Sequence, residues 1–268
     1  MYKELINSAT SSYPFLIEHK NVRYIPHFHE ETEIVYVLGG EVELTFGKSR
    51  KIAKEGDICV IPTGQIHNLY TYKDSRTYVI KLYPVADLSG ISLRSEIISE
   101  GDELYPALKR CVLGIMQEER EQRTGYKLAV NLYAGEISLL LLREFEHSEV
   151  SCATRNKHNT ENAFLKSVIE YLEENYNSDF GLDDVSNHFN YTKSYFCRYF
   201  KKITGNSFWE YYTMYRIERA IELLKGTPRE NFTVIANKSG FKNLRSFNQA
   251  FKTYCGCTPS EYRKRFDR

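Results

Sequence analysis

Three histidines and one glutamate near the N-terminus have the residue types and the spacing of a transition-metal site. His27 and His29 are two residues apart, so on an extended strand their side chains share one face. Glu33 follows four residues after His29, and His67 comes shortly after the turn formed by residues 62–64. Imidazole nitrogens together with a carboxylate suit a divalent transition metal. The pattern predicts such a site at His27, His29, Glu33 and His67, provided that the fold brings them together.

The same residues also suit a pocket for a polar small molecule. Three nearby tyrosines would add hydroxyl groups for hydrogen bonding and rings for stacking. The residues predicted for this effector pocket are Tyr24, His27, His29, Glu33, Tyr36, His67 and Tyr78. The sequence leaves both interpretations open, the metal site and the pocket without metal.

A second group of chemically active residues lies toward the C-terminus, where basic side chains gather. From Thr192 onward there are 16 Lys and Arg against 6 Asp and Glu, whereas residues 1–159 hold 19 against 22. A basic block behind a slightly acidic front half is typical of a protein with a nucleic-acid-binding domain. Charge alone does not decide this, so the elements that carry the basic residues must be identified.

Two similar pairs of short helices are predicted to position these basic residues. In the first pair, a helix with Leu182, Val185 and Phe189 on its apolar side ends near Asn190, and Thr192 supplies the N-cap of the next helix. About fifty residues later the same parts recur, with a helix over 232–238, a turn at Gly240 and a cap at Asn243. Both copies contain Phe-x-x-x-Phe-Lys, at 196–201 and 247–252. A tight turn followed by a basic, exposed helix predicts a duplicated helix-turn-helix, with reading helices over 193–203 and 244–253.

The rest of the chain predicts a β domain, a helical pair and a linker. Runs rich in Val, Ile, Tyr and Phe, separated by turn residues, predict strands over 32–38, 41–46, 57–61 and 77–82. Apolar residues at helical spacing predict helices over 103–121 and 126–147. The second helix has a wide apolar face, which indicates either a homodimer surface or simply closure of the domain's own core. The predicted domains are residues 1–100, the β-barrel; 101–148, the helical pair; 149–161, a polar linker; and 162–268, the DNA-binding domain.

The segment from Ala163 to Arg265 resembles the DNA-binding domain of the AraC/XylS family of transcription regulators. The resemblance is carried by the pairs 240–241, 246–247 and 251–252 (Gly-Phe, Ser-Phe and Phe-Lys) and by Gly-Cys-Thr-Pro-Ser-Glu-Tyr-Arg at 256–263. It implies that exposed residues of both reading helices contact bases, namely Ser194, Cys197, Arg198, Leu244, Arg245, Asn248 and Gln249. Lys193, Lys201 and Lys252 are expected to contact phosphates.

The two reading helices differ in how closely they follow the family pattern. Arg198 suits a bidentate contact to guanine, and Asn248 or Gln249 suits adenine. The family commonly has Arg where this chain has Gln249, and an aromatic ring where it has Ser246. We therefore expect the first reading helix to dominate recognition.

Residues 26–33 and 56–67 resemble the two sequence motifs of the cupin barrel. Regulators of the AraC type usually carry a degenerate cupin that binds a small effector, often a sugar. The second motif has Thr71 where metal-binding cupins usually have Asn. The resemblance implies an effector-sensing barrel in which a bound metal is possible and not required.

Together these features predict an α+β multidomain protein: an N-terminal cupin-like β-barrel with two dimerisation helices, and a C-terminal all-α double helix-turn-helix domain. The expected function is that of a sequence-specific, double-stranded-DNA-binding homodimeric transcription activator, not an enzyme, which responds to a carbohydrate and contacts RNA polymerase. The first residues lack a secretory signal, and no apolar run approaches the length of a membrane span, which favours a cytoplasmic protein. The alternatives are a metal-binding cupin enzyme or metal sensor fused to a DNA-binding domain, and an architectural DNA binder without a ligand.

Overall fold

The computed structural model describes residues 14–71, 74–82, 95–144, 152–227 and 229–264. The chain divides into two compact units, residues 1–162 and residues 163–268. The described part of the first unit contains all the strands, and that of the second contains helices only. The predicted α+β fold class is confirmed.

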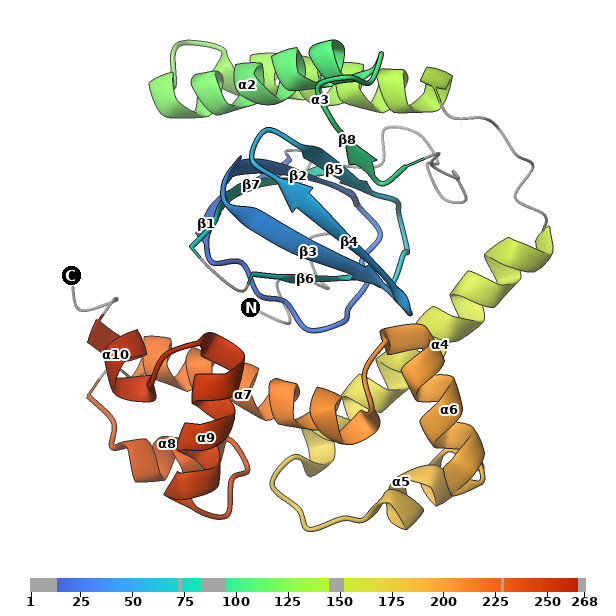
Figure 1. Ribbon diagram of the computed structural model, residues 1–268, viewed down its shortest axis with the longest axis vertical. Helices are drawn as coiled ribbons and strands as arrows, with labels where there is room; N and C mark the ends of the chain where they lie inside the picture. Colours follow the sequence, from blue (N-terminus) through green and yellow to red (C-terminus); the bar gives the residue numbers. More distant parts are fainter. Residues whose placement is uncertain (1–13, 72–73, 83–94, 145–151, 228, 265–268) are drawn as a thin grey trace. The chain divides into compact units, whose positions relative to one another are not determined.

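Two antiparallel sheets form the barrel of the first unit (Figure 1). The larger sheet has the order β1-β7-β2-β5-β8, and the smaller one has the order β4-β3-β6. The strands are β1 (Phe15–Lys20), β2 (Thr32–Gly39), β3 (Glu41–Phe46), β4 (Ser49–Lys54), β5 (Ile58–Ile61), β6 (Asn68–Tyr70), β7 (Arg76–Leu82) and β8 (Ile97–Ile98). Four of these strands correspond to the predicted ones within one residue at each end. The other four, β1, β4, β6 and β8, were not predicted.

Successive residues of the larger sheet point to two different cores. Val35 on β2 and Val79 on β7 face the barrel interior, where they pack with Leu44 of β3 and Leu69 of β6. Their neighbours in the same strands belong to a second core beneath the helical pair. The period-two alternation of a strand decides which residues enter the barrel and which contact the helices.

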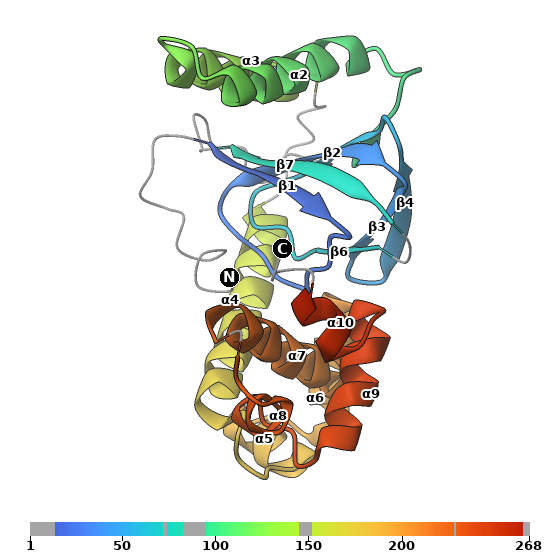
Figure 2. The same ribbon diagram turned by 90° about the vertical axis from the view of Figure 1, so that its left-hand side faces the viewer.

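The helical pair consists of α2 (Tyr105–Glu121) and α3 (Tyr126–Glu144), which lie over the outer face of the larger sheet (Figures 1 and 2). The two predicted helices are confirmed, although the end of the second, residues 145–147, lies outside the described residues. Gly114 permits close contact between the helices, because an added Cβ would lie 2.5 Å from Cζ of Tyr133. Leu128 and Leu132 of α3 are about two-thirds exposed, at 65% and 67%.

The segment predicted as a polar linker, residues 149–161, lacks helical periodicity in the sequence but is helical from Cys152 onward. Helix α4 begins there and continues to Asn175. The segment lacks proline and glycine, and it runs directly into the apolar residues Leu165, Val168 and Leu172, which are buried. A polar stretch without a helix breaker joins a neighbouring helix when tertiary packing holds that helix in place. Residues 149–151 lie outside the described part of the chain.

The second unit contains the two predicted helix-turn-helix motifs on either side of a central helix (Figure 1). Its remaining helices are α5 (Leu182–His188), α6 (Lys193–Thr204), α7 (Phe208–Gly226), α8 (Phe232–Lys238), α9 (Leu244–Cys255) and α10 (Pro259–Lys264). Asn190 and Gly240 hold the two turns with positive φ angles of 57° and 88°, as their residue types predict.

The two motifs are built by the same local interactions. The Thr192 hydroxyl accepts a hydrogen bond from the Tyr195 amide at 3.3 Å, and the Asn243 side chain accepts one from the Ser246 amide at 2.8 Å. Each cap satisfies an amide that the first helical turn leaves unpaired. The phenylalanines of the repeated motif are fully buried beneath the reading helices, at positions 196, 200, 247 and 251. The predicted duplication is therefore present at the level of caps, turns and core.

Candidate metal centre and nucleic-acid interface

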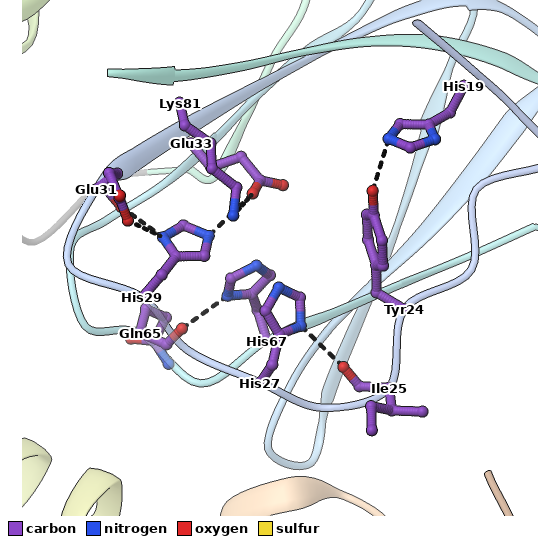
Figure 3. A network of polar contacts seen from close by, with 10 residues as sticks. All are labelled: His19, Tyr24, Ile25, His27, His29, Glu31, Glu33, Gln65, His67 and Lys81. Carbon is purple, nitrogen blue, oxygen red and sulfur yellow. Dashed lines mark hydrogen bonds and ion pairs between the residues drawn. The ribbon is translucent and has the colours of Figure 1, made fainter. Parts of the chain in front are cut away.

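The four predicted metal ligands meet inside the barrel (Figure 3). His27 and His67 lie opposite each other in a short antiparallel bridge, each with its amide bonded to the other's carbonyl at 2.9 Å. Glu33 is in β2, between Ile61 of β5 and Lys81 of β7. All four ligands are at most 4% exposed, and each offers a ligand atom within 4.8 Å of the other three.

The backbone fixes the orientation of all three imidazole rings in the same way. Nδ1 of each ring bonds a backbone carbonyl two residues away: Ile25 for His27 at 2.8 Å, Glu31 for His29 at 2.9 Å, and Gln65 for His67 at 2.7 Å. A carbonyl oxygen only accepts, so Nδ1 donates its proton in each ring, and in the neutral rings of His27 and His67 the lone pair is then on Nε2. A metal-binding histidine typically bonds a carbonyl through its other nitrogen in this way.

Three atoms of the cluster lack a hydrogen-bond partner among the described residues. They are Nε2 of His27, Nε2 of His67 and Oε1 of Glu33, and all three are buried. The fourth ligand, His29, places Nε2 2.9 Å from Oε2 of Glu33. Because buried polar atoms without partners cost free energy, this arrangement favours a cation at the centre of the cluster. The donor set therefore fits a divalent transition metal.

Burial sets the charge state of the cluster. It lowers the pKa of His27 well below the usual value, helped by His67 nearby, and lowers the pKa of His67 to about 4. Burial opposes ionisation of Glu33, but the hydrogen bond with His29 and the nearby positive groups outweigh it and hold that pKa far below its usual range. At neutral pH His27 and His67 are thus neutral imidazoles and Glu33 is an ionised carboxylate, which are the forms that bind metal.

Lys81 is a member of this site that the sequence did not reveal. Its side chain is 4% exposed, and its Nζ lies 3.8 Å from Oε2 of Glu33 (Figure 3). Burial lowers its pKa, while the neighbouring Glu33 raises it. The available signal was a single lysine within the apolar strand 76–82, whose alternation puts it on the face opposite Ile80.

Tyr24 lies beside the cluster, but the other two predicted tyrosines do not. The ring of Tyr24 is centred 5.5 Å from that of His27, and its hydroxyl bonds the side chain of His19 at 2.6 Å. The prediction that Tyr36 and Tyr78 line the same pocket is wrong, because both belong to the core beneath α2 and α3. Glu33 and Tyr36 are three residues apart in β2, so their side chains lie on opposite faces of the sheet.

The first predicted DNA-reading helix, α6, exposes the residues expected to contact bases. Ser194 and Arg198 are exposed and Cys197 is half-buried, while the opposite side of the helix packs into the core. Within the described part of the chain, the guanidinium of Arg198 donates one hydrogen bond, from Nε to the Ser194 carbonyl at 3.3 Å, and the side chain is exposed to solvent. Its position suits bidentate contact with a base edge.

The two lysines of α6 that are predicted to contact phosphate differ in their surroundings. Lys201 is exposed, as expected for a phosphate contact. Lys193 is exposed too, but its ammonium lies 2.7 Å from the Asp183 carboxylate. An exposed pair of this kind is weak, so phosphate can replace the carboxylate.

The second reading helix, α9, also exposes every predicted contact residue. They are Leu244, Arg245, Asn248 and Gln249 for bases, and Lys252 for phosphate. The predicted set also left out two exposed residues of α6, Lys202 and Tyr195, of which Tyr195 is 45% exposed and stacks on Tyr199. An aromatic residue in the first turn of a reading helix, next to Ser194, was the signal that pointed to it.

Two reading helices on a common frame, joined in one chain to a barrel with a buried histidine cluster, define a DNA-binding regulator. The sequence model of the helix-turn-helix domain family matches residues 185–265, and that of the cupin domain family matches residues 17–82. No helix among the described residues combines the length and apolar character that crossing a membrane requires.

Two of the curated relatives that the chain resembles are named as operon regulators. The chain is 38% identical over 100 residues to the transposon Tn10 TetD protein of Escherichia coli. The aligned segment covers 37% of this chain and 72% of that protein. It is 31% identical over 133 residues to the Msm operon regulatory protein of Streptococcus mutans, or 50% of this chain and 47% of the relative. It is 35% identical over 97 residues to the raffinose operon transcriptional regulatory protein RafR of Pediococcus pentosaceus. That aligned segment covers 36% of this chain and 35% of RafR. The chain thus spans about half the length, or less, of the two operon regulators.

The chain belongs to the AraC/XylS family of transcription regulators. Its DNA-binding function and its cupin domain, both predicted from the sequence, are confirmed at this level.

Proposed function

We propose that this regulator is controlled through its barrel, where a small-molecule effector binds at the histidine cluster. The observation that carries the proposal is the inward convergence of three imidazoles and Glu33, with buried atoms that the described residues leave unpaired. An effector changes DNA binding only by binding one arrangement of the protein more tightly than another. The site therefore senses a ligand, and we do not assign it an enzymatic turnover.

The effector class that we propose is a carbohydrate. Hydroxyl groups of a sugar both donate and accept hydrogen bonds, and the site offers acceptors in Glu33 and His67 and a donor in Lys81. Tyr24, beside His27, adds an aromatic ring and a hydroxyl. The regulator of a raffinose operon among the relatives supports this class.

A second candidate, favoured by the geometry of the rings, is that the barrel holds a divalent transition metal. His27, His29, Glu33 and His67 would be its ligands, and the backbone carbonyls of Ile25, Glu31 and Gln65 would keep the rings oriented. When bound, such an ion supplies a Lewis-acid centre for an oxygen atom of the effector. In this form the protein is a metal-dependent or metal-sensing regulator.

Metal analysis of the full chain separates these candidates. Chelator-treated protein is titrated with Mn²⁺, Fe²⁺ or Zn²⁺, and we expect about one ion per chain and a raised melting temperature. The double variant His27→Ala/His67→Ala should lose both effects, while Tyr78→Phe, on the other face of the sheet, should keep them. Unchanged binding by the double variant would overturn the metal site.

A thermal-shift screen against a panel of sugars, run with and without metal, tests the effector class. A sugar that raises the melting temperature and changes affinity for DNA supports the proposal. A panel in which no sugar has either effect contradicts the carbohydrate class and leaves the metal result unaffected.

We also propose that the chain forms a homodimer through α3. As a dimer it acts in the cytoplasm and activates transcription by contacting RNA polymerase. Exposed leucines on α3 support the dimer, at positions 128, 132 and 139. Membership of the AraC/XylS family supports activation. In vitro transcription from a bound promoter tests it, since repression would lower the yield of RNA where activation raises it.

A further inference from the structure

The two helix-turn-helix motifs meet around one backbone carbonyl, that of Tyr176, between α4 and α5. Two side chains of α7 donate hydrogen bonds to this oxygen: the Tyr212 hydroxyl at 3.1 Å and the Arg216 guanidinium at 3.3 Å. Arg216 also donates to the Tyr212 hydroxyl, and its guanidinium carbon lies 3.9 Å from the centre of the Tyr212 ring. A planar guanidinium held by two hydrogen bonds and a ring has one orientation.

The turn of the second helix-turn-helix motif packs against the same groups. Gly240 has a φ of +88°, and an added Cβ there would lie 2.3 Å from the Tyr176 oxygen and 2.8 Å from Nε of Arg216. The ring of the next residue, Phe241, is centred 5.8 Å from the guanidinium carbon. Only glycine combines this backbone conformation with such a close approach. Arg216 thus joins the turn of the second helix-turn-helix motif to the segment that leads into the first motif.

A surface contact joins the same two segments. The ammonium of Lys242, two residues after Gly240, lies 2.8 Å from the carboxylate of Asp179, three residues after Tyr176. Both side chains are largely exposed, so the pair adds little stability. It nevertheless restrains the same two segments in the same relative position.

We infer that Arg216 is a positioning residue that fixes the angle between the reading helices α6 and α9. Helix α7 connects the two helix-turn-helix motifs, and α8 and α9 pack against it, with the Tyr254 hydroxyl of α9 donating a hydrogen bond to the Glu218 carboxylate of α7. A further contact to one side of α7 restrains rotation of the second motif about this helix. The Tyr176–Arg216–Gly240 contact supplies that restraint. Because one base pair rotates the groove by about 35°, a fixed angle makes the chain select the spacing between its two contact sites on DNA.

The test measures how binding depends on that spacing. The operator is first selected from random duplexes with the full-length protein, and duplexes with one base pair added or removed between the two contacted boxes are then compared. Wild-type protein should lose more than tenfold in affinity on the altered duplexes. Arg216→Gln should lose less than threefold, and Arg216→Lys, which keeps the charge without the planar fork, should behave like Arg216→Gln. If Arg216→Gln keeps the wild-type spacing penalty, the inference is wrong.

Matched variants separate positioning from charge and from folding. Lys225→Gln removes one positive charge from the same helix and should keep the full spacing penalty; a relaxed penalty there would overturn the inference. Circular dichroism shows whether Arg216→Gln folds. If it does not fold, Asp179→Asn decides the question, because this exposed substitution should be tolerated. We then expect the spacing penalty to fall at least twofold, and an unchanged penalty counts against the inference.

Discussion

Arg198 shows what a single side chain contributes to recognition. It extends from the exposed face of α6, and among the described residues its one hydrogen bond is to the backbone of its own helix. A guanidinium free to form two parallel hydrogen bonds discriminates guanine, whereas a lysine on the same face attracts any phosphate. The two kinds of residue should therefore differ in how they affect specific and non-specific DNA.

Substitution of Arg198 by Ala tests this difference. We expect binding to the cognate operator to weaken by about 1–3 kcal/mol while binding to random DNA hardly changes. The matched control is Lys201→Ala on the same helix, which should weaken both by a similar factor and reduce the salt dependence. Titration of labelled duplexes at two salt concentrations measures both effects. Equal losses on both duplexes for Arg198→Ala would refute base reading.

Each helix-turn-helix shows how local sequence specifies an element. The turn residues Asn190 and Gly240 adopt positive φ angles, and the caps Thr192 and Asn243 start the reading helices. Helix α4 shows the opposite case, since tertiary packing extends a helix into a stretch whose composition indicates a linker. Caps and turns are local interactions, whereas the start of α4 depends on what its apolar end contacts.

The caps should contribute similar stability to the two motifs. Thr192→Ala and Asn243→Ala are each expected to lower the free energy of unfolding by about 1 kcal/mol, because each leaves a helix-terminal amide unpaired. Urea denaturation followed by circular dichroism measures the change. Thr253→Ala, an exposed substitution inside α9, should alter the stability by less than about 0.5 kcal/mol. A loss confined to one motif would contradict equal roles of the caps.

At the scale of the whole molecule, the proposed dimer depends on the exposed face of α3. Leu128 and Leu132 are among the most exposed large apolar residues of the described chain. In a monomer they would stay in water, and in a dimer each would contribute the free energy of burial, about 1.5–3 kcal/mol when complete. A pair of DNA-binding domains would then face two operator half-sites.

Charge on this face should separate the protomers. The double variant Leu128→Glu/Leu132→Glu is expected to sediment as a monomer and to lose at least tenfold in affinity for a two-site operator, because burying unpaired carboxylates is costly. Analytical ultracentrifugation gives the oligomeric state. Ile52→Glu, on the exposed face of β4, is the control and should remain a dimer. A dimeric double variant would exclude this face as the interface.

The sequence determined those features that depend on neighbours along the chain. The repeated turn, cap and phenylalanine pattern specified both reading helices, because caps and turns act over a few residues. Spacing also indicated the candidate metal ligands, since His27 and His29 share a face on any extended segment. The composition of the last third indicated nucleic acid as the partner.

Tertiary structure decided what depends on the pairing of distant strands and helices. Lys81 enters the cluster because β7 pairs with β2 in the register that sets it opposite Glu33, and the same alternation sends Tyr36 and Tyr78 to the helix side. The contact of Arg216 with Tyr176 and Gly240 likewise joins residues more than twenty positions apart. Register and long-range contacts are set by the packing of the whole core. The sequence could therefore name the candidate ligands and the reading helices, while only the fold showed which further residues lie beside them.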